Sequence, residues 1–308
     1  MYQKILLELS RHAAFKKLMM ACPLTRAVVR RFVPGESWAG ARPAIADLID
    51  RGLTVAVDYL GEDTEDENQA ETMVGNYLAI LDHIAKEGWA GSAEVSVKLS
   101  AIGLRLADGE NIARANLTRL AERAQAVGSM VTVDMEDCSV TDKTIRVVTA
   151  VRRTYPDLGL VLQAQLRRTE IDCAEVDAPG ARVRLCKGSY DSPDAVAYPS
   201  KHEVDLSYVR SLKILMEGAG RPLVATHDPI MIEIAQELAA HSNRGPKDFE
   251  FQMLYGVRPV EQSRLADLGH PVRVYLPFGT DWYRYLVRRL AERPGNLVFF
   301  LNALLPSR

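Results

Sequence analysis

The sequence predicts an α/β protein that forms a closed (β/α)8 barrel, with a helical extension in front of it. Eight short runs rich in β-branched residues alternate with helical stretches, and their starts lie 23 to 40 residues apart. Each gap has room for one crossover helix, as parallel strands require. The alternation occupies about 240 residues, which is typical of a single barrel of this kind. Composition agrees, because 47% hydrophobic and 25% charged residues are ordinary for a globular chain.

The elements follow in order. Residues 1–50 are predicted to be helical, because Ile5, Leu6 and Leu9 share one helical face and a further helix over 42–51 opens near Pro43. We therefore place the extension at 1–50 and the barrel at 51–308. The predicted strands are TVAVDYL (54–60), EVSVKL (94–99), VTVDME (131–136), GLVLQA (159–164), VRLCK (183–187), PLVATH (222–227), FEFQML (249–254) and VRVYLPF (272–278). Helices between them include 113–126, 142–154 and 229–240.

A doubly wound open sheet is the competing arrangement of alternating strands and helices. It normally needs fewer strands, and a dinucleotide site in it would need a GxGxxG motif after a strand. No such motif follows any predicted strand; Gly218 and Gly220 form a GxG, but it precedes a strand and lacks the third glycine. The closed barrel is therefore favoured.

Charge and cysteine content exclude several classes of protein. Lys plus Arg is 38 and Asp plus Glu is 40, so the basic excess of a nucleic-acid-binding protein is missing. The cysteines are too few for a disulfide scaffold and none has CxxC spacing, so we expect free thiols in the reducing cytoplasm and no metal site. They are Cys22, Cys138, Cys173 and Cys186.

The sequence shows neither a membrane span nor a secretory signal. No run approaches 18 uncharged apolar residues, and charges interrupt the first 20 residues. Basic residues near the N-terminus form either an ordinary solvated face or a surface for peripheral membrane contact. They are Lys16, Lys17, Arg26, Arg30 and Arg31.

Polar side chains interrupt barrel strands that should be almost continuously apolar. Most fall in the C-terminal half of their strand, which is the end where barrel enzymes build their active sites. An unpaired buried charge costs several kcal/mol, so Lys98, Asp134 and Arg184 must find partners, solvent or a ligand. Any one of them could belong to an ion pair at the barrel mouth, but polar groups at the same end of so many strands favour a binding site. The others are Ser96, Glu136, Asp137, Gln163, Gln165, Arg182, Lys187, Thr226, His227, Asp228, Gln252 and Tyr275.

Two charged segments flank this predicted site. The acidic stretch GEDTEDENQAE (61–71) is either a solvated helix start or a mobile gate over a pocket. The segment GTDWYRYLVRRLAERP (279–294) predicts a helix between Thr280 and Pro294. One face of it carries Tyr285, Arg288, Arg289 and Glu292. Paired guanidiniums suit a carboxylate or phosphate, although a solvated surface is the alternative. The residues alone therefore predict a site for a small anion.

The ordered motifs of the chain resemble those of the proline dehydrogenase family over about residues 45–303. The motifs are LGE (60–62), VKLS (97–100), VDMED (133–137), LQAQLRRTEID (162–172), VRLCKGSYDSP (183–193), ATHD (225–228), FEFQMLYGVRP (249–259) and YLPFGTDWYRYLVRRLAERP (275–294). The resemblance implies a distorted barrel of the monofunctional form, because 308 residues leave no room for an aldehyde dehydrogenase domain. It also implies oxidation of L-proline to 1-pyrroline-5-carboxylate with FAD taking the hydride, the first step of proline catabolism to glutamate, and electrons passed to a quinone.

The resemblance implies roles for individual residues. Asp134 and Arg184 would be catalytic, with Arg184 also against the flavin. A gate glutamate is expected at Glu67, with Glu65 and Glu62 as alternatives. The substrate would be bound by Lys98, Tyr190, Tyr275, Arg288, Arg289 and Glu292. The cofactor would be bound by Met135, Gln163, Lys187, Gly188, Ser189, Thr226 and His227. The chain departs from the family at Ser189, often alanine, and at Asp228, where some relatives have asparagine.

Two other functions are compatible with a barrel. A Schiff-base aldolase would use Lys98 or Lys187 as nucleophile, but it predicts a phosphate-binding glycine cluster after strands seven and eight, where only Gly256 and Gly279 occur. An inert binding module predicts loss of the site residues, which are present. The sequence leaves open the oligomeric state and the discrimination between proline and hydroxyproline.

Overall fold

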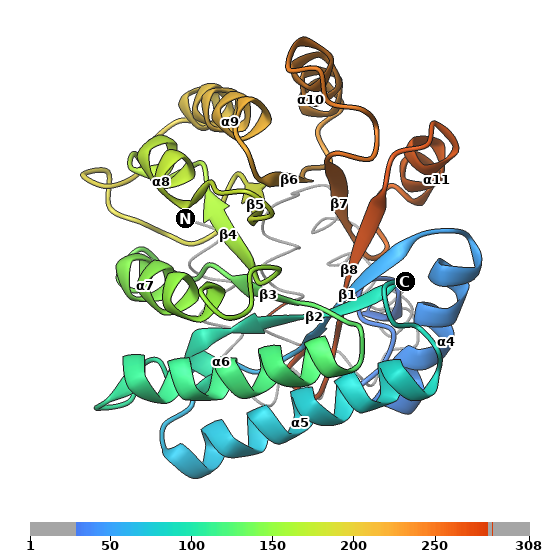
Figure 1. Ribbon diagram of the computed structural model, residues 1–308, viewed down its shortest axis with the longest axis vertical. Coiled ribbons are helices and arrows are strands. Elements are labelled where there is room, and N and C mark those ends of the chain that lie inside the picture. The colour runs from blue at the N-terminus through green and yellow to red at the C-terminus, as the bar shows by residue number, and fades with distance from the viewer. Residues whose placement is uncertain (1–28, 283–284, 286–308) are drawn as a thin grey trace, which may run out of the picture.

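The computed structural model describes residues 29–282 and Tyr285 of the chain. Eight parallel strands form a closed barrel in which each strand pairs with the next and β8 pairs with β1 (Figure 1). The predicted closed barrel is therefore confirmed, and the open sheet is excluded. The strands are β1 (Thr54–Tyr59), β2 (Ala93–Lys98), β3 (Val131–Asp134), β4 (Gly159–Gln163), β5 (Arg182–Cys186), β6 (Arg221–Ala225), β7 (Glu250–Leu254) and β8 (Val272–Phe278).

Helices form a layer around the strands, in chain order (Figure 1). They are α4 (Trp38–Asp50), α5 (Glu67–Lys86), α6 (Gly109–Ala126), α7 (Thr141–Arg152), α8 (Thr169–Val176), α9 (Lys201–Glu217), α10 (Pro229–His241) and α11 (Pro259–Asp267), with a 3-10 turn η1 (Leu99–Ile102) after β2. None of the helices in the described ranges is long and apolar enough to cross a membrane. The predicted helices over 113–126, 142–154 and 229–240 correspond to α6, α7 and α10.

The start predicted for the helix over 42–51 is wrong. Helix α4 begins at Trp38, because the Ser37 side chain caps it by accepting a hydrogen bond from the Gly40 amide at 3.4 Å. Pro43 lies inside the helix rather than at its first position. The apolar face of α4 compensates for the hydrogen bond that proline cannot donate, since Ile45 and its neighbours on that face are fully buried in the core. The division between extension and barrel at residue 50 stays a prediction.

Alternation along β2 separates side chains of the apolar outer layer from polar side chains of the barrel interior. In β2, Val95 and Val97 belong to the hydrophobic core, whereas Glu94, Ser96 and Lys98 alternate with them and contact residues of other strands across the barrel. All five side chains are buried. Ser96 and Lys98, two of the polar strand residues that the sequence singled out, therefore lie inside the barrel.

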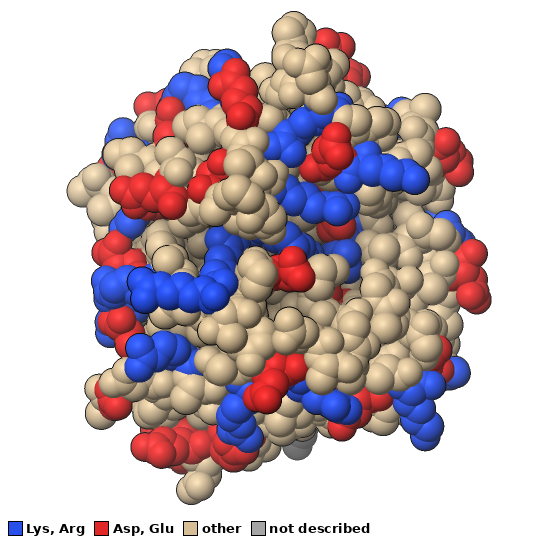
Figure 2. Space-filling view, in the orientation of Figure 1, with Lys and Arg blue, Asp and Glu red and all other residues tan. Residues whose placement is uncertain are grey.

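The outer surface carries both signs of charge. Figure 2 shows Lys and Arg interspersed with Asp and Glu, and basic side chains gather in the hollow at the middle of the face in view. The described cysteines are free thiols, as predicted; they are Cys138, Cys173 and Cys186.

Candidate active site

Asp134, at the end of β3, is the centre of the polar cluster inside the barrel. Its Oδ1 accepts hydrogen bonds from Ser96 Oγ at 2.9 Å and from Arg184 Nη1 at 2.7 Å. Its Oδ2 accepts from the Tyr275 hydroxyl at 2.7 Å and lies 3.8 Å from Lys98 Nζ. Strands β2, β3, β5 and β8 thus bring together Lys98, Asp134, Arg184 and Tyr275, which sequence reasoning had placed in one site.

Asp58 on β1 is a partner of this cluster that sequence reasoning missed. Lys98 Nζ donates to its two carboxylate oxygens at 2.9 and 3.0 Å, and Asp58 is completely buried. Burial by itself would lower the pKa of Lys98, but the carboxylates of Asp58 and Asp134 raise that pKa well above the ordinary lysine value. Lys98 is therefore held as a charged ammonium. An aspartate inside the apolar run TVAVDYL was the signal that could have revealed Asp58.

Tyr275 presents its phenol as a hydrogen-bond donor. Burial, and then the charge of Asp134, raise the pKa of Tyr275 well above its ordinary value. The Arg184 guanidinium lies 5.4 Å from the centre of the Tyr275 ring, within the range of a cation–π contact. The Tyr275 ring and the Asp134 carboxylate therefore both hold the Arg184 guanidinium in place.

Two buried polar atoms in this region have no hydrogen-bond partner among the described residues. One is Arg184 Nη2 and the other is Gln163 Oε1. Gln163 uses only its amide nitrogen, which donates to the Met135 carbonyl at 3.3 Å. A buried polar atom left without a partner costs about 1–3 kcal/mol, so such atoms usually meet a ligand or ordered water. The site therefore has one donor and one acceptor ready for a bound molecule.

The loop after β5 packs against Gln165 through Gly188. Its φ of +106° is in the left-handed region, and a Cβ there would lie 2.4 Å from the Gln165 side chain. Gln165 Nε2 donates to the Tyr190 carbonyl at 2.9 Å and so fastens this loop. Only glycine fits this position. Ser189 is exposed and Tyr190 is half-buried beside it.

Carboxylates of α9 and of the loop after β6 hold Lys187. Its Nζ lies 2.5 Å from Asp205 Oδ1 and 2.8 Å from Asp228 Oδ2. An aldolase nucleophile must be a neutral amine, usually produced by desolvation or a neighbouring cation. Lys98 and Lys187 are both paired with two carboxylates, so the geometry argues against the aldolase alternative.

The loop after β6 places Thr226 and His227 at the barrel mouth. Thr226 is buried, and its hydroxyl accepts from the Asp228 amide at 3.1 Å. His227 Nε2 accepts from the Leu254 amide at 2.8 Å, which ties the ring to β7. Both residues are therefore in the expected region, and their assignment to a cofactor stays a prediction.

The acidic segment after β1 is partly helix start and partly anchored loop. Glu67 is the exposed first residue of α5, and Asp66 caps that helix. Thr64 is buried and its hydroxyl donates to the Ser100 carbonyl at 2.9 Å. Glu62 is half-buried, and its carboxylate contributes to the raised pKa of Lys98. Glu62 is therefore electrostatically coupled to the site, whereas Glu67 is solvated.

The predicted anion clamp lies outside the described residues, because Arg288, Arg289 and Glu292 are not among them. Tyr285, on the same predicted face, is described and buried. Lys16, Lys17 and Arg26 also lie outside, and Arg30 and Arg31 are exposed. In the part of the chain that the structure covers, no cluster of His, Cys, Asp or Glu could hold a metal ion.

Comparison with known proteins is consistent across sequence and structure. A family model described as Proline dehydrogenase matches residues 41–301. The chain is 35% identical to Proline dehydrogenase 1 of Bacillus subtilis (strain 168) over 305 residues, 99% of each chain. It is 34% identical to the proline dehydrogenase of Deinococcus radiodurans over 281 residues, 90% of each chain.

Among solved structures, proline utilization A (PutA) from Bdellovibrio bacteriovorus, inactivated by N-propargylglycine, matches with a TM-score of 0.81 and 27% identity. The match covers 87% of this chain and 33% of that chain. A mutant of Bradyrhizobium japonicum PutA matches with a TM-score of 0.74 and 26% identity, over 92% of this chain and 32% of the other. The chain thus spans about a third of these larger proteins.

Proposed function

This chain belongs to the proline dehydrogenase family, and from that premise we propose that it oxidises L-proline to 1-pyrroline-5-carboxylate by hydride transfer to a bound FAD. The observation that carries the proposal is the convergence of Lys98, Arg184 and Tyr275 on the Asp134 carboxylate, in a region where two buried polar atoms have no hydrogen-bond partner in the described chain. The cluster supplies positive charge for a carboxylate and negative charge for an amine. An amino acid carries both groups.

The donor set suits a flavin. Arg184 Nη2 lies 3.7 Å from the Glu94 carboxylate but donates no hydrogen bond to any described residue, and Gln163 Oε1 accepts none from them; an isoalloxazine offers both an acceptor and a donor along its edge. When bound, FAD supplies the two-electron acceptor, and the protein supplies binding and electrostatics. The left-handed Gly188 lets the loop after β5 pack closely against Gln165. We assign the remaining contacts of the cofactor to Met135, Lys187, Ser189, Thr226 and His227.

Proline would be held by its carboxylate. Lys98 is kept charged by Asp58, and Arg288 and Arg289 would add a bidentate clamp oriented by Glu292. Tyr190 and Tyr275 would pack against the pyrrolidine ring.

Asp134 would lie near the proline nitrogen. Loss of a hydride from the ring carbon leaves a cationic imine, and a fixed carboxylate stabilises the positive charge as it develops. The same carboxylate would assist loss of the ammonium proton before the hydride leaves. Hydrogen bonds from Ser96, Arg184 and Tyr275 hold Asp134 in one orientation for this role.

For the gate, we propose Glu62 in place of Glu67. Glu62 is half-buried and influences Lys98, whereas Glu67 is exposed at the start of α5. The anchored Thr64 lies between them and limits how far the segment after β1 moves as one piece. We also propose that a quinone accepts the electrons and that the protein is cytoplasmic, with peripheral contact to the membrane.

The test is the visible spectrum of the purified protein before and after anaerobic addition of L-proline. A flavin spectrum that bleaches supports the proposal, and a colourless protein or a spectrum unmoved by proline contradicts it. Arg288→Met tests the clamp: the KM for proline should rise strongly while flavin content stays unchanged. Loss of flavin in this variant would show that Arg288 is not a substrate clamp.

A further inference from the structure

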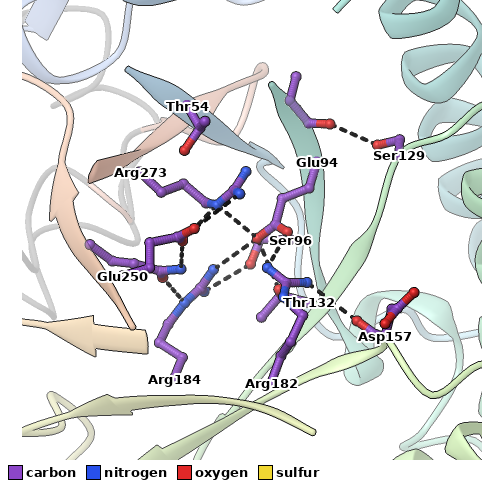
Figure 3. Close-up of polar contacts among 12 residues, drawn as sticks. Thr54, Glu94, Ser96, Ser129, Thr132, Asp157, Arg182, Arg184, Glu250 and Arg273 are labelled. Carbon is purple, nitrogen blue, oxygen red and sulfur yellow. Dashed lines mark hydrogen bonds and ion pairs between the residues drawn. The ribbon is translucent and has the colours of Figure 1, made fainter. Parts of the chain in front are cut away.

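Five buried side chains are joined in a closed ring inside the barrel (Figure 3). We call this set the floor ring. Its members come from β2, β5, β7 and β8, and each is at most 5% exposed. They are Glu94, Arg273, Glu250, Gln252 and Arg184.

Hydrogen bonds and ion pairs run all the way around the floor ring. Arg273 Nε donates to Glu250 Oε1 at 2.8 Å, and Gln252 Nε2 donates to the same oxygen at 2.7 Å. Gln252 Oε1 accepts from Arg184 Nε. Glu94 Oε1 closes the ring, because it lies 3.7 Å from Arg184 Nη2 and 3.6 Å from Arg273 Nε.

The hydrogen-bonding chemistry of the floor ring fixes the orientation of the Gln252 amide. The ionised Glu250 carboxylate only accepts hydrogen bonds, so the Gln252 amide must turn its NH2 group toward it. The amide oxygen then faces Arg184 and accepts from it. Glu250 therefore determines, through Gln252, which atom lies against the Arg184 guanidinium.

Glu94 has four polar partners among the described residues in this region. Besides its two contacts in the floor ring, it accepts from Arg182 Nη2 at 2.6 Å and from the Thr132 hydroxyl at 2.9 Å. Burial would raise the pKa of Glu94, but the guanidiniums of Arg182, Arg273 and Arg184 lower it to about 2. Glu94 is therefore ionised under ordinary conditions, and together with Glu250 it faces the three guanidiniums (Figure 3), one of which, that of Arg184, also pairs with Asp134.

We propose that Glu94 is a positioning residue for Arg184, and that through Arg184 it sets the reduction potential of the bound flavin. The inference rests on the proposed function, since it takes Arg184 to contact that cofactor. Glu94 acts in two ways: it constrains the guanidinium, directly and through Arg273, Glu250 and Gln252, and it offsets the positive charge beneath the site.

Neutralising Glu94 should make the flavin easier to reduce. In Glu94→Gln the three guanidiniums would keep two carboxylate partners, Glu250 and Asp134, in place of three, and positive charge near a flavin stabilises its more anionic reduced form. A unit charge acting over roughly 10 Å at an effective dielectric constant near 20 changes an equilibrium by roughly tenfold. For a two-electron couple a tenfold change is about 30 mV. The midpoint potential should therefore rise by about that amount.

The experiment uses the full chain loaded with FAD and titrated against a reference dye without proline. Glu94→Gln should raise the midpoint potential, and Arg182→Gln, which removes a positive charge from the same cluster, should lower it. The double variant Glu94→Gln/Arg182→Gln should return the potential toward that of the unmodified protein. Glu110→Gln is the matched control, because Glu110 pairs with Arg146 at 2.7 Å on the surface; it should leave the potential unchanged.

The possible results separate failure of this inference from failure of the proposed function. A Glu94→Gln protein that binds FAD and keeps the potential of the Glu110→Gln control overturns the inference while leaving the proposed function intact. If Glu94→Gln does not fold, Arg182→Gln decides, and an unchanged or raised potential in it also overturns the inference. An unmodified chain that takes up no FAD instead contradicts the proposed function, and the inference with it.

Discussion

The acid stability of the protein should depend on Glu94. The neighbouring guanidiniums lower the pKa of this carboxyl to about 2 in the folded protein, whereas a glutamate in an unfolded chain titrates near about 4.3. A pKa that is depressed by folding contributes stability above the unfolded value, and this stability is lost as the pH falls through the folded value. The stability that ionised Glu94 contributes is therefore lost between about pH 4.3 and pH 2.

The magnitude follows from the shift. A difference of about two pH units, at 1.36 kcal/mol per unit, contributes about 3 kcal/mol to the free energy of unfolding at pH 6. Roughly half of this contribution should be lost by pH 3, because the unfolded chain then binds a proton that the folded protein still resists. The contribution of about 3 kcal/mol needs no reduction for solvent screening of the ion pairs, because Glu94 is completely buried.

Urea unfolding of the unmodified protein and of Glu94→Gln, followed by circular dichroism from pH 6 to pH 3, measures this effect. The variant should be less stable than the unmodified protein at pH 6. This difference in the free energy of unfolding, the stability gap, should narrow steadily toward pH 3, since glutamine does not titrate. Other carboxylates titrate in both proteins and cancel in the difference. Glu110→Gln serves as the surface control and should show a small, nearly constant gap. A gap for Glu94→Gln that stays constant over the whole range would refute the reasoning.

Three further predictions concern the site and its loops. Lys98→Met leaves the buried Asp58 without its partner and should lower the free energy of unfolding, measured with urea, by about 3–5 kcal/mol. The double variant Asp58→Asn/Lys98→Met should recover most of this loss. If it recovers none, Asp58 and Lys98 are not coupled. Gly188→Ala should reduce flavin content and thermal stability, because the new Cβ would lie 2.4 Å from the Gln165 side chain. The control Gly180→Ala, with φ +80° and no atom within 4 Å of its Cβ, should lower the free energy of unfolding by only about 1–2 kcal/mol. Equal effects of the two substitutions would count against a close approach at Gly188. Thr64→Val removes a buried hydroxyl that donates to a carbonyl 2.9 Å away, so limited proteolysis within 61–66 should become faster, and an unchanged cleavage rate would contradict an anchoring role.

The strand positions could be read from the sequence because a buried parallel strand has a strong local pattern. All eight predicted runs coincide with strands to within a few residues. The start of α4 could not be read as well, since Pro43 suggested a first helical position while the weaker signal of Ser37 determined the cap. Polar groups near the strand ends likewise predicted that Lys98, Asp134, Arg184 and Tyr275 would meet.

The sequence by itself determined the fold class, the family resemblance and some of the residues that carry charge into the barrel, among them Lys98, Asp134 and Arg184. Only the tertiary structure decided how those charges pair. Asp58 holds Lys98, and Glu94 bridges arginines from β5 and β8 that lie 88 and 179 residues further along the chain. The physical reason is that strand patterns are local and repeat every two residues, whereas barrel closure brings inward-facing side chains of distant strands together at the axis.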